Sequence, residues 1–121
     1  MSDYNYEQVL SDTGIHEMIR QCMSKERFRA AIYINNGEER IRIAKKILGM
    51  AQCKGRFSQF QAQIDFDNGS VIYISPAVES MRCRRSCMVM FGEDVSEHIK
   101  ETVIRKTLID YRCFAPKTPV N

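Results

Sequence analysis

The residues of this chain that are best able to do chemistry are its arginines and lysines, which gather in two stretches. Residues 20–56 hold ten basic and three acidic side chains, and a second basic run stands at residues 82–85. Guanidinium and ammonium groups that share one surface attract the phosphates of a nucleic-acid backbone, whereas scattered ones only solvate helix faces. The candidate phosphate contacts are Arg40, Arg42, Lys45, Lys46, Arg82, Arg84 and Arg85.

Two acidic residues, Glu93 and Asp94, follow an apolar run at residues 86–91. The carboxyl end of a buried strand is a place where α/β folds hold functional groups. Asp94 also forms a capping-box pattern with Glu97, which predicts a helix over residues 95–109. The cap explains Asp94 without catalysis, and Glu93 has the weaker structural explanation.

Cysteine and histidine could bind a metal or act as nucleophiles, but their spacing favours neither. Among five cysteines and two histidines, only Cys83 and Cys87 form a close pair, and structural zinc sites usually need two such pairs. The chain has no Gly-x-Ser-x-Gly elbow and no Gly-x-x-x-x-Gly-Lys phosphate loop. We therefore expect no metal, no cofactor and no organised catalytic residues.

The sequence carries no signal for a membrane or for export. No apolar run approaches the roughly 18–20 residues that span a bilayer, and the first ten residues lack the basic and apolar regions of a signal peptide. Five cysteines, an odd number, fit reduced thiols in an unexported protein. The expected location is the cytoplasm, that of the host cell if the protein is viral.

Apolar residues spaced three and four apart predict helices, and one such stripe starts at Ile15. Asn36 followed by Glu39 is typical of the cap that begins a helix. In that helix the apolar face is expected to include Ile41, and the basic residues of positions 40–46 are expected on the opposite face. The expected helices span residues 4–10, 12–23, 38–51 and 95–109.

Apolar runs and alternation predict strands at residues 29–35, 60–66, 71–74 and 86–91. Asn68 and Gly69 predict a type I′ hairpin turn between the second and third of these, because Asn-Gly accepts two positive φ angles. Residues 54–56 are expected to form a loop.

The length of 121 residues fits one domain, since domains most often hold about 100–150 residues. Strand–helix–strand alternation predicts parallel strands, to which the hairpin adds an antiparallel part. The expected fold is a single small α/β domain over residues 1–112, with a mixed β-sheet, a β-hairpin and three or four packed helices. Residues 113–121 are expected to be a loose C-terminal tail.

Three segments together resemble P-loop ATPases of the phage terminase large-subunit and helicase type. Residues 65–75, DFDNGSVIYIS, look like the terminase hairpin, and residues 82–85, RCRR, resemble its arginine element. Residues 87–94, CMVMFGED, are similar to a Walker B strand followed by its acidic pair. The resemblance implies a partial RecA-like layer.

The same resemblance has clear departures. The Walker A residues are missing at residues 12–16, Glu93 and Asp94 stand in the reverse order, and Cys83 replaces a glycine. The resemblance therefore implies a degenerate relative in which Glu93 and Asp94 are Walker B-like remnants. Mg²⁺ and the phosphates of a nucleotide would lack their main ligands.

Two functions are favoured by this sequence, ahead of a third, a degenerate enzyme with residual nucleotide chemistry at Glu93 and Asp94. The first is a non-catalytic binding protein, derived from a phage or a mobile element, that contacts nucleic-acid phosphates through a basic surface. The alternative is a small inhibitor or adaptor that binds a host or partner protein, which short length and seven methionines allow. Exposed strand edges would also allow a homodimer.

The absence of Walker A predicts that the protein does not turn over ATP. Phosphate release with Mg²⁺-ATP should equal that of a protein-free blank, because no lysine and no glycine-rich loop hold the β- and γ-phosphates. Turnover that Glu93→Gln abolished would contradict this prediction.

Overall fold

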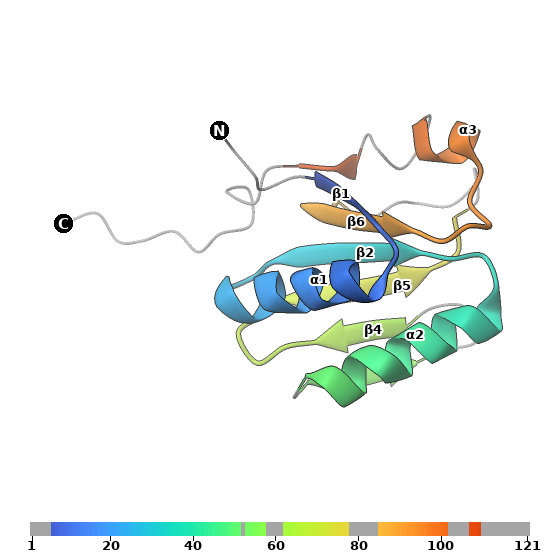
Figure 1. The fold of residues 1–121 in the computed structure, drawn as a ribbon. Coiled ribbons are helices and arrows are strands. Elements are labelled where there is room, and N and C mark those ends of the chain that lie inside the picture. The colour runs from blue at the N-terminus through green and yellow to red at the C-terminus, as the bar shows by residue number, and fades with distance from the viewer. Residues whose placement is uncertain (1–5, 52, 58–61, 78–84, 102–106, 110–121) are drawn as a thin grey trace.

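The computed structural model describes residues 6–51, 53–57, 62–77, 85–101 and 107–109. Within these ranges the chain forms six strands in one mixed sheet, together with three helices (Figure 1). In chain order the elements are β1 (Tyr6–Val9), α1 (Asp12–Ser24), β2 (Arg29–Tyr33), α2 (Gly37–Met50), β3 (Lys54–Phe57), β4 (Ala62–Asp65), β5 (Val71–Ser75), β6 (Met88–Phe91) and α3 (Glu97–Ile99). The predicted α/β class is confirmed.

The sheet has the strand order β1-β6-β2-β5-β4-β3. The first four strands in this order are parallel to one another, whereas β4 pairs antiparallel with β5 and β3 pairs antiparallel with β4. The predicted combination of a parallel layer and a hairpin is thus confirmed. In this arrangement β6, the last of the described strands in chain order, lies between β1 and β2.

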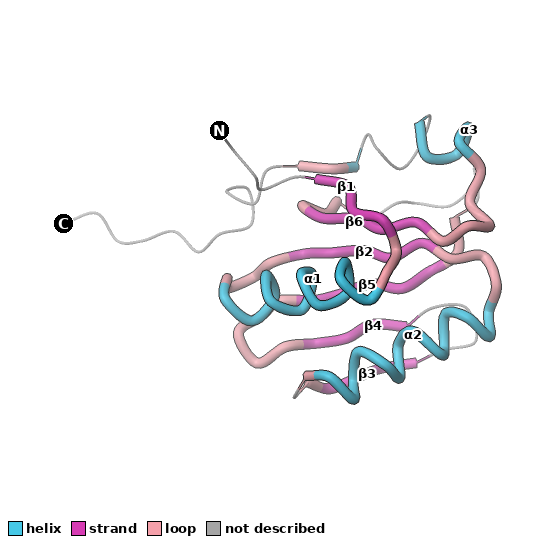
Figure 2. Tube along the Cα trace, viewed as in Figure 1, coloured by secondary structure: helices cyan, strands magenta, loops and turns pink. Residues whose placement is uncertain are grey.

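Helices α1 and α2 lie on the same face of the sheet (Figure 2). Their apolar stripes pack against alternate residues of the strands, including Ile32, Ile72 and Met90, to form the main core. A smaller cluster on the second face is built around Tyr33, Phe91 and neighbouring residues, with Ile99 of α3 packed against it. None of the helices in the described ranges has both the length and the apolar composition needed to cross a membrane.

The helix expected at residues 4–10 is wrong, because Tyr6–Val9 is the edge strand β1. It pairs in parallel with β6, with Tyr6 opposite Met88. A segment this short gains little as an isolated helix, and pairing with a distant strand decides its conformation. The residues before Tyr6 lie outside the described ranges.

The helix expected at residues 95–109 is also wrong in its cap and its length. The α-helix α3 spans Glu97–Ile99, and residues 102–106 of the expected helix lie outside the described ranges. Its N-cap is Ser96, whose side chain accepts a hydrogen bond from the Ile99 amide. Leu108 forms an isolated parallel bridge with Ser86. The Asp94 carboxylate is engaged elsewhere, and it therefore does not cap this helix.

The hairpin between β4 and β5 exists, but its turn differs from the type I′ turn expected. Gly69 has a φ of 86°, whereas Asn68 is not among the residues with positive φ. The Gly69 amide donates to the Phe66 carbonyl, and the Phe66 amide donates to Ser70. This pattern is that of a three-residue loop that ends in a left-handed glycine. The expected loop at residues 54–56 is instead part of β3, which pairs with β4.

Gly14, in the first turn of α1, lies close to the end of β1 and to the Met90 side chain of β6. A Cβ at this position would stand 2.5 Å from the Val9 carbonyl oxygen and 2.9 Å from the Met90 sulfur. At Gly49, in the last turn of α2, a Cβ would meet no atom within 4 Å.

Gly14→Ala should therefore lower the free energy of unfolding by about 1–3 kcal/mol, because backbone and core must shift. Gly49→Ala, the matched control, should raise it by roughly 0.4–1 kcal/mol through reduced unfolded-state entropy. Urea unfolding followed by circular dichroism measures both, and equal effects of the two substitutions would contradict the close approach at Gly14.

Candidate nucleic-acid interface

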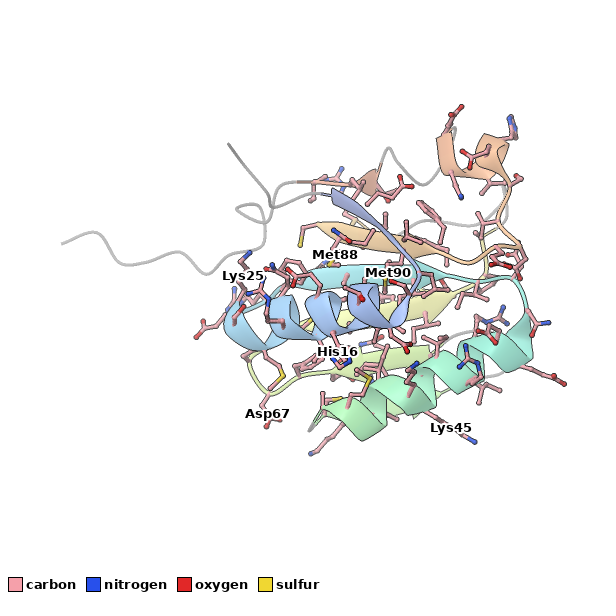
Figure 3. The ribbon with its side chains drawn as sticks, in the orientation of Figure 1. His16, Lys25, Lys45, Asp67, Met88 and Met90 are labelled. Atoms are coloured by element: carbon pink, nitrogen blue, oxygen red, sulfur yellow. The ribbon has the colours of Figure 1, made fainter. Side chains whose placement is uncertain are left out.

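The basic residues on the outer side of α2 are largely paired with acids. Arg42 forms an ion pair with Glu39, and Lys46 forms one with Asp12 at the start of α1. Lys45 is exposed, points away from the sheet (Figure 3), and has no ion pair with another described residue. Two of these three positive charges are thus compensated.

These ion pairs shift the titration of their members. The hydrogen bond from Lys46 lowers the pKa of Asp12, and the one from Arg42 lowers the pKa of Glu39. The pKa of Arg42 is raised by the same hydrogen bond to Glu39. The pairs are charged at neutral pH, and their contribution to stability is lost as pH falls through the lowered pKa values of the acids.

Arg40 does not lie on the exposed side of α2 that was expected for it. The residue is 8% exposed, and its Nη1 donates to the carbonyls of Ile34 at 2.8 Å and Asn35 at 2.7 Å. Ile41, expected in the core, is 49% exposed. The buried stripe of α2 keeps Ala44 and Ile47 as expected, but it includes Arg40 and Ile43 in place of Ile41. The Arg40 guanidinium holds the loop before the helix.

The second basic run is only partly described. Arg82 and Arg84 lie outside the described residues, and Arg85 is exposed at the amino side of β6, with no ion pair to a described residue. Helix α2 contacts β3, β4 and β5, and β2 lies between those strands and β6. Among the described residues, Arg85 therefore lies apart from the α2 bases.

Asp94 joins the carboxyl ends of neighbouring strands. Its carboxylate accepts hydrogen bonds from the amides of Asn35, at 3.0 Å, and Asn36, at 2.7 Å. The Asn35 side chain donates to the Asp94 carbonyl at 3.1 Å and accepts from the Ala77 amide at 2.7 Å. Glu93 is exposed and forms no hydrogen bond or ion pair within the described part of the chain. The two acids of the Walker B-like pair thus have different surroundings.

The turn at residues 12–16 leaves little opportunity for a phosphate. The Ser11 hydroxyl accepts from the Gly14 amide at 3.0 Å, which uses one of the free amides of the helix start. Asp12 adds a negative charge in the first turn of α1, as Glu38 and Glu39 do in α2. Carboxylates at a helix N-terminus occupy the place that an anion would take.

A different basic surface lies on the second face of the sheet, opposite α1 and α2. In the strand register, Arg56 stands beside Gln63 and Gln63 beside Tyr73, while Lys54 stands beside Asp65, Asp65 beside Val71 and Val71 beside Arg29. Side chains paired in this way project from the same face of a sheet. We call this surface the open face; its polar members are Arg29, Lys54, Arg56, Gln63, Asp65 and Tyr73.

The open face holds three basic residues and one acidic residue. Arg29 and Lys54 are exposed, and Arg56 Nε lies 3.1 Å from Asp65 Oδ2, with 71% of the Arg56 side chain exposed. Gln63 Nε2 donates to Asp65 Oδ1 at 2.9 Å, so the Asp65 carboxylate accepts hydrogen bonds from both Arg56 and Gln63. Three strand spacings separate Lys54 from Arg29, a width of about 14 Å.

Sequence reasoning missed the open face because it placed residues 54–56 in a loop. The available signal was alternation: Lys54 and Arg56 are two apart, as are Gln63 and Asp65. Only the pairing of β3 with β4 shows that these two sets share a face.

The described cysteines are free thiols, and two of them, Cys22 and Cys87, are buried. Burial raises the pKa of Cys22 well above its usual value. Within the described ranges no group of three or more His, Cys, Asp or Glu side chains is placed to hold a metal ion. Cys83, the other member of the close pair, lies outside those ranges.

Comparison of the chain with protein-family models, with curated proteins and with solved structures finds no match.

Asp94→Ala should lower the free energy of unfolding by roughly 1–3 kcal/mol, because two backbone amides lose a charged acceptor. The neighbouring Glu93→Ala is the control and should change stability by less than about 0.5 kcal/mol. Thermal or urea unfolding of both variants measures the difference. An equal loss in the two variants would show that the Asp94 hydrogen bonds do not stabilise the fold.

Proposed function

We propose that the protein binds nucleic acid without catalysis and that the open face contacts the phosphates. The observation that supports this most directly is the register of β3, β4, β5 and β2, which places Arg29, Lys54 and Arg56 on one exposed surface. Phosphate contacts of this kind give affinity with little dependence on sequence and with a strong dependence on salt.

The open face is a better candidate than the outer side of α2. On α2, Arg42 and Lys46 already have acidic partners, and the Arg40 guanidinium is buried against carbonyls. On the open face, Arg29 and Lys54 are exposed, and the Arg56 side chain is 71% exposed although it is paired with Asp65. Arg85 adds a further basic side chain at the amino side of β6. This end of β6 lies beside Arg29, because the Cys87 amide donates a hydrogen bond to the Arg29 carbonyl.

Kinship with the terminase and helicase ATPases is part of the same proposal. It is supported by the parallel order β1-β6-β2 and by Glu93 and Asp94 at the end of β6. The capped, acidic start of α1 fits a relative that has kept the sheet and lost the nucleotide site. A phage or mobile-element origin and a cytoplasmic location follow from that kinship.

A protein partner is the second candidate, and the edge strand β1 favours it. This strand ends the sheet order, and Val9 at its end is 81% exposed. An exposed strand edge can pair with a strand of another protein or of a second copy, as in a homodimer. An inhibitor or adaptor would use such an edge.

Fluorescence anisotropy with labelled DNA and RNA tests the nucleic-acid proposal. Three phosphate contacts on a single strand predict an affinity loss of about 20-fold between about 50 and 200 mM salt. Replacing Arg29, Lys54 and Arg56 together by Gln should remove most of this affinity and most of its salt dependence.

The matched control replaces Arg42, Lys45 and Lys46 by Gln, which removes the same charge from α2. We expect this variant to keep most of the affinity. If the α2 variant loses binding and the open-face variant does not, the proposed surface is wrong. If the unmodified protein binds no nucleic acid at low salt, the proposed function is wrong, and pull-down with β1 variants becomes the next step.

A further inference from the structure

We infer that the open face is specific for single-stranded nucleic acid and that Tyr73 stacks on an unpaired base. This inference rests on the proposed function and adds the class of ligand. Tyr73 stands between Gln63 on one side and Ala31 on the other in the strand register. It is partly exposed, whereas Tyr33 and Phe91 of the same sheet face are only 1% and 8% exposed. Among the described aromatic residues of this face, Tyr73 is the one that a ligand can reach most easily.

The basic side chains of the open face lie around Tyr73 at distances that suit the phosphates of one nucleotide and its neighbours. Arg56 is two strand spacings away, about 10 Å, and Arg29 is one strand across and two residues along, about 8 Å. A nucleotide whose base lies on the Tyr73 ring would thus have basic side chains on both sides, close to the phosphates that flank it. Aromatic rings flanked by basic groups are the usual means of binding single strands without sequence preference.

A duplex does not fit this arrangement. Its bases are stacked on one another, so their faces are hidden, and only their edges are reachable in the grooves. The side chains of the open face project from neighbouring strands of a sheet, which presents a broad surface. Unpaired bases can be splayed onto such a surface and stacked on its aromatic side chains.

Three labelled probes test the inference by fluorescence anisotropy at low salt: an oligo-dT single strand, a duplex of the same length, and a single strand of the same length whose central sugars lack bases. The abasic strand keeps every phosphate and removes the stacking partner. Loss of a stacked base should weaken binding by roughly 5-fold to 150-fold. We expect the single strand to bind at least about 5-fold more tightly than either the duplex or the abasic strand.

Two substitutions place the stacking on Tyr73. Tyr73→Leu should weaken binding of the single strand by a similar factor, should leave binding of the abasic strand unchanged, and should leave the salt dependence unchanged. Tyr73→Phe keeps the ring and should bind within about twofold of the unmodified protein. Circular dichroism confirms that each variant is folded, and the abasic probe tests the unmodified protein if Tyr73→Leu does not fold.

The results that overturn the inference differ from those that overturn the proposed function. Equal binding of the single strand and the abasic strand, or a duplex bound as tightly as the single strand, would overturn base stacking while phosphate binding stands. Tyr73→Leu that binds the single strand like the unmodified protein would do the same. If none of the three probes bound, the proposed function itself would be wrong.

Discussion

The position of β2 determines the position of most other elements in the described fold. β2 is hydrogen-bonded to β6 on one side and to β5 on the other, and Ala30–Tyr33 are buried. Ala30 and Ile32 belong to the core under the helices, whereas Ala31 and Tyr33 belong to the second face. A slip of one residue would exchange these two sets, so the register is strongly determined. The same register places Arg29 in line with β5, β4 and β3.

The two ends of the parallel strands differ in charge. At the carboxyl ends stand Asp12, Glu38, Glu39, Glu93 and Asp94, close to the two helix starts. α/β folds usually bind anionic ligands at that end of the sheet, where helix N-termini attract them. Here acidic side chains already occupy those places. Exposed basic side chains lie instead on the open face and at the amino ends of the strands, which is where the proposed phosphate binding would take place.

Local signals predicted part of this fold, and distant contacts decided the rest. The cap formed by Asn36 and the hairpin around Asn68 were predictable because each depends on neighbouring residues. The β1 strand and the short α3 were not predictable in this way, since pairing with β6 and the hydrogen bonds of Asp94 depend on residues far away in the chain. For the same reason, counting charges along the sequence identified the basic residues but not the surface on which they gather. Which basic side chains share a surface depends on the ion pairs of α2 and on the register of the strands.

The insertion of β6 between β1 and β2 has a consequence for synthesis of the chain. A ribosome releases both β1 and β2, with α1 between them, before the strand that joins them exists. Until Met88–Phe91 emerge, one edge of β2 and the edge of β1 that faces it lack their sheet partner. Open edges of this kind can pair with strands of other nascent chains. Closing the long loop to β6 is slow for entropic reasons, so a chaperone that shields strand edges would be of most use to this protein after β2 has emerged and before β6 has.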